Sequence, residues 1–237
     1  TEVRARYLFN LSDFSGPVRV MGARVKLDAA RNEIYLVEGN TIRVFNTAGM
    51  ETYSFTVDGS VGRVSDLVVE ASGDLLLICA PPEPRAGAPS FFIERCDYRG
   101  EPKQAIVPAL PESVAGFGPT FTELRDDKLY LVNASQLRLV ILRTDGSFVR
   151  VIDLAPLLNV DKTDVGNLEI GGFGLDPQGN MLFTVPELFQ ATVLDADGKA
   201  VGSFGKSGSA PGRFGVVSGV AGDSKGNIYV AGKARSV

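Results

Sequence analysis

The sequence offers few residue types that could do chemistry, because it contains no histidine. This excludes Ser–His and Cys–His catalysis, and zinc sites built on imidazole, from the residues of this sequence. An enzyme made from it would depend on carboxylates, Lys, Tyr or Cys. Three polar residues, Arg24, Asp66 and Thr120, occupy the same position in a repeated strand. We predict that these three residues bind a ligand. The alternative is that they only line a water-filled space.

Acidic residues could bind a metal ion at two kinds of place. Asp28, Asp176 and Asp223 each stand at a turn, where a carboxylate commonly accepts hydrogen bonds from nearby backbone amides, so we expect them to cap their own turns. Residues 161–164 form with Glu169 the one local acidic cluster, and oxygen ligands of this kind could hold Ca²⁺. The cluster lacks the alternating pattern of a dedicated calcium loop. We therefore predict no cofactor, with calcium as the alternative.

The two cysteines, Cys79 and Cys96, lie on strands that we expect to be neighbours. Symmetric pairing about the proline-rich loop between them places Cys79 opposite Phe92 and Cys96 opposite Leu75. The sulfur atoms would then be about four residues out of register, roughly 13 Å apart. Bridging them would draw prolines into the paired ladder, which proline resists. The sequence therefore predicts two free, buried thiols.

Charge and hydropathy exclude several classes of partner. The chain of 237 residues has 24 Lys and Arg against 28 Asp and Glu, a net charge of −4, and the charges are scattered singly. A nucleic-acid-binding protein normally shows a basic patch, so we predict no nucleic-acid partner. No apolar stretch approaches the roughly 18 residues that a membrane span needs, so we predict no membrane insertion.

The elements that must position these residues are repeated strands. Five segments share a strand, a turn rich in Asp, Gly and Asn, and a second strand: GVAGDSKGNIYVA at 219–231, GFGLDPQGNMLFT at 172–184, and weaker copies at 24–36, 66–78 and 120–132. The copies recur every 40–55 residues or so, and an Asp/Asn…Gly turn after the first four leads into further strands. This is the spacing of β-propeller blades, each with four antiparallel strands. We predict an all-β propeller with four full blades, a partial fifth and almost no helix.

The first strand of each copy alternates between two kinds of residue. In a propeller this strand lines the central channel, so one side of it should face the channel. Arg24, Lys26, Asp66 and Thr120 fall on the side that we expect to face the channel. The positions between them are apolar and are expected to pack between blades: Val25, Leu67, Phe121, Phe173 and Val220.

The segment 201–231 resembles the NHL repeat. It has an aromatic–Gly strand, a Gly-x-x-Pro-Gly-x-Phe loop variant, and the turn and strand Gly-Asn-Ile-Tyr-Val-Ala. The resemblance implies a propeller of six blades. We therefore expect one domain over residues 1–237 that is incomplete at its C-terminus, a natural chain that continues beyond Val237, and a strand over Val3–Leu11 that closes the last blade. A five-bladed propeller is the alternative.

Long loops over 81–89, 102–119 and 154–171 are where binding function commonly concentrates. Phe117, Leu157 and Leu158 are candidate anchors for a partner, unless they pack beneath their own loops. The resemblance favours a non-catalytic binding or scaffold propeller that presents its loops and channel mouth to a protein, peptide or glycan. It also favours a secreted or periplasmic location. The alternative function is a calcium-dependent, lactonase-like hydrolase that uses the channel.

Overall fold

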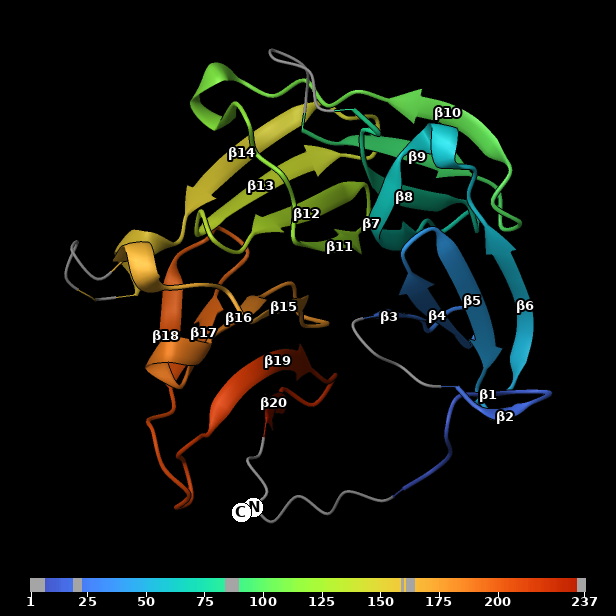
Figure 1. Cartoon of the computed structure of the whole chain (residues 1–237). Coiled ribbons are helices and arrows are strands. Elements are labelled where there is room, and N and C mark those ends of the chain that lie inside the picture. The colour runs from blue at the N-terminus through green and yellow to red at the C-terminus, as the bar shows by residue number, and fades with distance from the viewer. Residues whose placement is uncertain (1–6, 19–22, 84–89, 159, 161–164, 234–237) are drawn as a thin grey trace. The chain divides into compact units, whose positions relative to one another are not determined.

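A computed structural model describes most of the chain and divides it into two compact units. The first unit spans residues 1–88 and 92–106, and the second spans 89–91 and 107–237. All regular elements of the described residues are β-strands and single-turn 3-10 helices (Figure 1). Nothing in this described part is helical over a length that could cross a membrane. The described residues are 7–18, 23–83, 90–158, 160 and 165–233.

The first unit contains two four-stranded antiparallel sheets, in which strands that follow one another in sequence pair side by side. The first sheet comprises β3 (Arg24–Asp28), β4 (Glu33–Glu38), β5 (Thr41–Asn46) and β6 (Glu51–Thr56). The second comprises β7 (Arg63–Val69), β8 (Leu75–Ala80), β9 (Phe92–Cys96) and β10 (Pro102–Ile106). The smaller elements are the hairpin of β1 (Ser12–Asp13) and β2 (Gly16–Pro17) and the turn η1 (Gly59–Val61).

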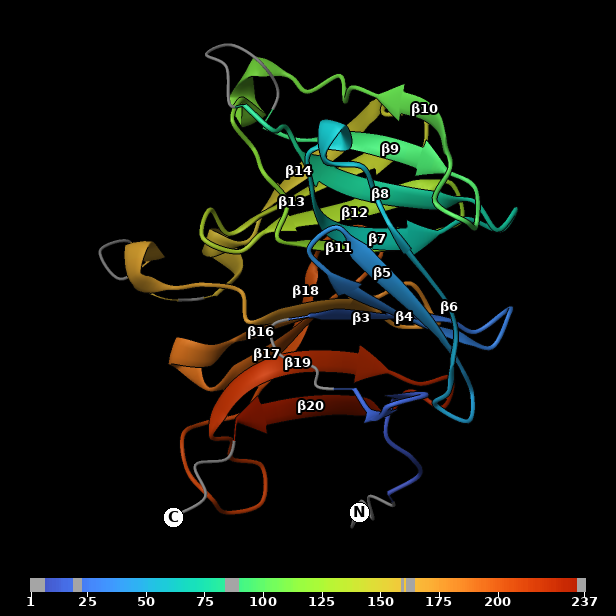
Figure 2. The ribbon, with the colours of Figure 1, turned by 45° about the vertical axis from the view of Figure 1, so that its right-hand side comes forward.

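The second unit repeats the same sheet twice and adds a two-stranded sheet (Figure 2). Its first sheet comprises β11 (Phe121–Arg125), β12 (Lys128–Asn133), β13 (Arg138–Arg143) and β14 (Phe148–Asp153). Its second comprises β15 (Gly172–Leu175), β16 (Met181–Val185), β17 (Gln190–Leu194) and β18 (Ala200–Phe204). The two-stranded sheet and the 3-10 turns are β19 (Val216–Gly222), β20 (Ile228–Lys233), η2 (Glu112–Val114), η3 (Ala155–Leu157), η4 (Val165–Asn167) and η5 (Pro186–Leu188).

These four-stranded antiparallel sheets are the blades of a β-propeller, and the predicted all-β fold is confirmed. The predicted strand over 3–11 is not found in its described part, because residues 7–11 form no strand. Residues 1–6 lie outside the described part of the chain. Strand structure begins instead at Ser12, whose backbone N–H donates to the carbonyl of Gly49 at 2.7 Å.

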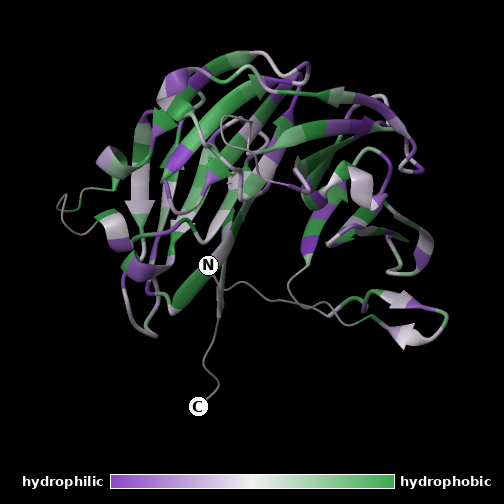
Figure 3. Cartoon of the chain, turned by 45° about the horizontal axis from the view of Figure 1, so that its top comes forward, coloured by the Kyte–Doolittle hydropathy of each residue, from purple (hydrophilic) through white to green (hydrophobic). Residues whose placement is uncertain are grey.

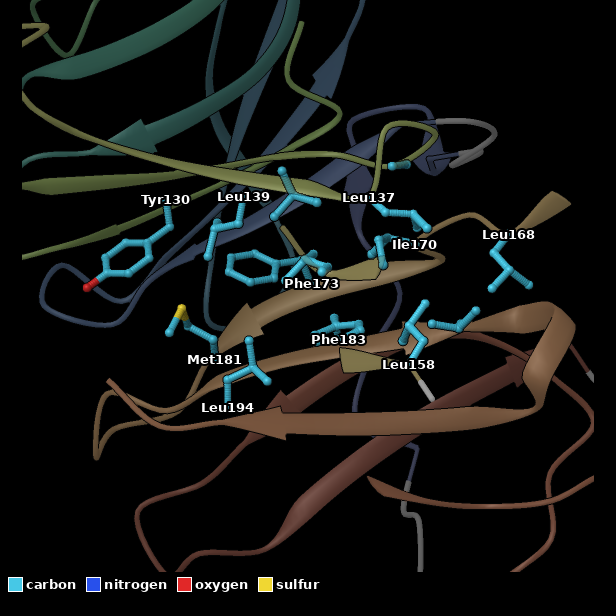
Figure 4. Close-up of a cluster of buried hydrophobic side chains, with 14 of the residues drawn as sticks. Tyr130, Leu137, Leu139, Leu158, Leu168, Ile170, Phe173, Met181, Phe183 and Leu194 are labelled. Atoms are coloured by element: carbon cyan, nitrogen blue, oxygen red, sulfur yellow. The ribbon is translucent and has the colours of Figure 1, made fainter. Parts of the chain in front are cut away.

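Hydrophobic side chains hold neighbouring blades together within each unit. In Figure 3 the hydrophobic colouring follows the strands, and many of the turns are hydrophilic. In the second unit, side chains of β12 and β13 such as Leu139 pack with Phe173, Met181 and Phe183 from β15 and β16 (Figure 4). Phe183 and Met181 are fully buried there. Burial of this kind stabilises by about 25 cal/mol per Å² of apolar surface, so the contact between blades is a main source of stability.

Val25 was predicted to pack between blades, but this prediction is wrong because the residue is 51% exposed. Register explains the difference: Val25 pairs with Leu36, whereas its neighbour Lys26 pairs with Tyr35. Directly paired residues share a face of a sheet, and the Tyr35 face is the one that packs against the second blade. The face that carries Val25 is the opposite one.

Arg31 links the first blade to the second. It lies in the β3–β4 turn, and its guanidinium donates to the carbonyls of Glu70 and Ala71 at 3.4 and 2.7 Å, in the β7–β8 turn. Asp28 accepts from the same guanidinium at 2.8 Å and holds it in place. The guanidinium lies against Gly73, whose φ of +95° suits glycine.

The same kind of link recurs twice in the second unit. The guanidinium of Arg125, at the end of β11, donates to the carbonyls of Asp176 and Pro177 at 2.9 and 3.0 Å in the β15–β16 turn. From that turn, the amide of Gln178 donates to the carbonyl of Ser224 at 3.4 Å in the β19–β20 turn. A side chain at the first turn of one blade thus bonds the backbone at the first turn of the next.

The cysteines are placed as predicted. Cys79 pairs with Phe92 and Cys96 with Leu75 in the β8–β9 ladder. Both thiols are free and buried. Burial raises the pKa of each thiol to about 12, so neither is a thiolate near neutral pH.

Candidate functional site

Two of the predicted channel residues meet in the first unit. Asp66 on β7 is 1% exposed, and one of its carboxylate oxygens lies 3.2 Å from Nζ of Lys26 on β3. Burial raises the pKa of Asp66, and the positive charges of Lys26 and Arg24 oppose that rise. Asp66 is therefore part of a buried ion pair between blades. Sequence reasoning noted the alternation of Arg24 and Lys26 but did not identify Lys26 as the partner of Asp66.

Thr120 lies in the second unit, just before β11. Its hydroxyl accepts from the backbone N–H of Ala134 at 3.1 Å, and its own N–H donates to the carbonyl of Val132 at 2.6 Å. These bonds anchor the start of the strand. A ligand site made jointly by Arg24, Asp66 and Thr120 stays a prediction.

The predicted partner anchors pack inside the second unit. Phe117 is fully buried, with its ring 6.2 Å from that of Phe91 in an edge-on contact. Leu158 is 5% exposed within the core, and Leu157 packs against the same core from a half-buried position. The turns η2 and η3 fold these side chains beneath their own loops. Phe117 and Leu158 are therefore not exposed anchors, which corrects that interpretation.

The turn acids cap their own turns, as predicted. Asp28 accepts from the backbone N–H of Ala30 at 3.0 Å, and Asp223 accepts from Asn227 at 2.9 Å. Bonds from Asn227 hold the pKa of Asp223 at about 2. Residues 161–164 of the calcium alternative lie outside the described residues. Within the described part, no three His, Cys, Asp or Glu side chains gather as a metal site would need.

A hollow of about 630 Å³ opens between the two blades of the first unit. It was not predicted from the sequence. The β3–β4 turn and the strands β4, β5 and β6 line it from the first blade, and the β7–β8 and β9–β10 turns line it from the second. The residues that give it chemical character are three tyrosines and four charged side chains: Arg31, Glu33, Tyr35, Tyr53, Asp74, Tyr98 and Arg99.

The three tyrosines of this hollow differ in exposure. Tyr35 is 2% exposed and donates its hydroxyl to Glu33 at 2.7 Å. Burial, and then the bond to Glu33, raise the pKa of Tyr35. Tyr53 is 40% exposed and donates its hydroxyl to the carbonyl of Arg99 at 3.3 Å, while Tyr98 is 58% exposed. Two aromatic rings are thus open to a ligand, and bonds to the protein hold Tyr53 in position.

A second hollow, of about 420 Å³, lies on the opposite face of the first blade, the face that carries Arg43 and Ser54; Thr52 and Tyr53 of the edge strand β6 line both hollows. The β1–β2 hairpin forms one wall, where Phe14 is fully exposed. Arg43 ties the hairpin to the sheet, because its guanidinium binds Asp13 at 2.7 Å and also contacts Glu51.

We call the first hollow the aromatic groove, which presents Tyr53 and Tyr98; Phe14 is exposed at the second hollow, on the other face of the blade. Exposed large aromatic side chains gathered around hollows are typical of interaction sites. The only sequence signal was Tyr98 within the Asp97–Gly100 turn, a position where the repeats otherwise carry small or polar residues. Its meeting with Tyr53 depends on the packing of one blade on the next.

No family model and no curated protein matches the sequence. The fold is similar to that of a protein of unknown function from Bacteroides caccae, with a TM-score of 0.60, 11% identity, and coverage of 90% of this chain and 72% of that one. The β-propeller domain of Cps50 (Swd1) from Myceliophteria thermophila has a TM-score of 0.56 and 12% identity, with coverage of 92% of this chain and 64% of that one. Catalytically inactive virginiamycin B lyase from Staphylococcus aureus, with quinupristin, has a TM-score of 0.55 and 13% identity, with coverage of 93% of this chain and 74% of that one.

These neighbours have different functions, and their low identity shows the β-propeller fold alone. The chain spans about two thirds to three quarters of the length of each of these three structures.

Proposed function

We propose that this chain is a non-catalytic binding propeller that presents the aromatic groove to a protein or peptide partner. The observation that carries the proposal is a hollow of about 630 Å³ between two blades, at which the side chains of Tyr53 and Tyr98 are both exposed. Tyrosine, phenylalanine and arginine are enriched at protein interfaces, and clustered aromatic side chains commonly dominate the binding energy.

The groove is held in place before any partner arrives. Tyr53 is fixed by its hydroxyl bond to the Arg99 carbonyl, and the hydroxyl of Tyr35 is fixed by its bond to Glu33. An aromatic side chain that is already positioned loses little conformational entropy on binding, so a preformed groove favours affinity. The resemblance to the NHL repeat supports the same role, and a secreted or periplasmic location remains part of the proposal.

Selection from a displayed random-peptide library tests the proposal. Enriched peptides should bind the purified protein saturably, measured by fluorescence anisotropy, and Tyr98→Ala should weaken them at least tenfold. Tyr229→Ala is the matched control, because Tyr229 is 46% exposed but belongs to β20 in the second unit. It should leave the affinity unchanged within about twofold.

Two results would overturn the proposal. One is that no peptide is enriched over a library panned without the protein. The other is that enriched peptides bind Tyr98→Ala as well as the unchanged protein. A parallel glycan array separates the remaining partner class: glycan binding that depends on Tyr98, without peptide binding, would replace the peptide partner by a saccharide.

A further inference from the structure

We infer that the first hollow, of about 630 Å³, recognises a basic side chain, a lysine or arginine of the partner, placed against Glu33 between the rings of Tyr53 and Tyr98. This inference rests on the proposed function, because it names the chemistry that the aromatic groove selects.

Glu33 is the carboxylate available to such a cation. Its side chain accepts the hydroxyl of Tyr35 at 2.7 Å, and no ion pair joins it to another described residue. The other acid of the hollow, Asp74, is already paired with Lys103 at 2.7 Å. A carboxylate that receives one neutral hydrogen bond keeps most of its capacity to accept from an ammonium or guanidinium group.

Arg31, the arginine near Glu33, is already bonded to other groups. Arg31 lines the same hollow, but its guanidinium is paired with Asp28 at 2.8 Å and donates to the carbonyls of Glu70 and Ala71. These bonds hold the guanidinium on the β7–β8 turn. Asp28 also offsets the charge of Arg31, so that charge does not cancel the attraction of Glu33 for a second cation.

The tyrosine rings favour the same kind of ligand. A cation over the face of an aromatic ring is attracted by the negative charge of that face, and the interaction strengthens when water is displaced. The hollow already shows one such contact, since the guanidinium carbon of Arg99 lies 5.3 Å from the ring centre of Tyr98. The ring of Tyr53, 40% exposed, supplies a second aromatic surface in the lining of the hollow.

The overall charge of the protein agrees with a basic partner. The charged lining of the hollow comprises two arginines and two carboxylates, of which Arg31 and Asp74 are already paired with Asp28 and Lys103 outside the lining. The protein is acidic as a whole, with a net charge of −4. Opposite charge steers a partner toward a site and selects against partners of the same sign. An anionic ligand in the hollow would depend on Arg99 alone, because Arg31 is paired with Asp28.

The sequence provides a direct optical readout of the hollow. The chain has no tryptophan and six tyrosines, and three of these line the hollow. Tyrosine fluorescence therefore reports on its occupancy. The probe is the pentapeptide Gly-Ser-Arg-Ser-Gly, acetylated and amidated at its ends, compared with versions that carry citrulline or glutamate in place of arginine.

We expect the arginine peptide to bind saturably, and the citrulline peptide to bind about tenfold more weakly, which corresponds to about 1.4 kcal/mol. Glu33→Gln should weaken the arginine peptide by a similar factor while keeping an oxygen that accepts from Tyr35. Glu38→Gln, at the other end of β4, is the matched control and should change the affinity less than twofold. Arg99→Ala should not weaken binding of the arginine peptide.

Several outcomes would overturn the inference. It fails if the arginine peptide does not bind, if the citrulline peptide binds equally well, or if Glu33→Gln has no effect on the affinity. Preference for the glutamate peptide, lost in Arg99→Ala, would make the hollow an anion site. The test of this inference is distinct from the test of the proposed function. If library-selected peptides depend on Tyr98 but carry no basic residue, the groove binds peptides and only the preference for a basic side chain is wrong.

Discussion

The buried pair of Lys26 and Asp66 gives the sharpest test of the packing between blades. Lys26→Met removes the cation and leaves a carboxylate whose side chain is 2% exposed. Breaking a buried ion pair by removing one partner costs about 3–5 kcal/mol, because an uncompensated charge stays buried. Arg24 still favours the charged form of Asp66, so we place the loss at the lower end, about 3 kcal/mol.

The loss should depend on pH in a defined direction. Burial raises the native-state pKa of Asp66 above the value of about 3.9 in an unfolded chain. Proton binding therefore favours the native state, and this contribution is lost as the pH rises through the native pKa. Without Lys26 the native pKa rises further. The deficit of Lys26→Met should be largest at pH 7 and should shrink as the pH falls toward 5.

Urea unfolding followed by circular dichroism at both pH values measures these free energies. Lys103→Met is the matched control, since Lys103 is also paired with an aspartate of the first unit but is 48% exposed. Exposed pairs contribute about 0–1 kcal/mol, so the control should lose no more than that. The double variant Lys26→Met/Asp66→Asn should recover part of the loss, because it no longer buries an unpaired charge.

The reasoning is refuted if Lys26→Met and Lys103→Met lose the same stability at pH 7. It is also refuted if the deficit of Lys26→Met grows as the pH falls, since that would mean that Asp66 is stabilised in its charged form by other groups.

Two further predictions follow from the same unit. Gly73→Ala should lower the free energy of unfolding by about 1–2 kcal/mol, because its φ is +95° and the new methyl group would lie 3.1 Å from the guanidinium of Arg31. Gly202→Ala, with open space around it and an ordinary φ, should change stability by less than about 0.5 kcal/mol in the same urea assay. Cys79 and Cys96 should resist a thiol reagent such as iodoacetamide at pH 8 in the folded protein and react fully in guanidinium chloride, measured by mass. Rapid alkylation of the native protein would show that these thiols are not buried.

The repeated turns made the blades predictable from sequence. Each Asp/Asn…Gly turn fixes where two strands meet, so the pairing of Cys79 with Phe92 follows from local spacing alone.

The candidate site was less predictable, because it depends on which face of one blade packs on the next. Alternation separated Lys26 from Val25 but could not say which of them faces the second blade. The aromatic groove depends on the same choice, since it brings Tyr53 on β6 beside Tyr98 in a turn 45 residues later. Only packing between distant segments decides such meetings.

The side chains that reach from one blade to the turn of the next have a consequence for how such a protein can be rearranged. Arg31 and Arg125 bond backbone carbonyls, which any residue sequence in the following turn would supply. The receiving turn needs only its shape and a glycine where the guanidinium lies, as at Gly73 and Gly179. A blade could therefore be duplicated, exchanged or moved and still be joined to its new neighbour. Gene rearrangement could lengthen or shuffle the array without evolving each junction again.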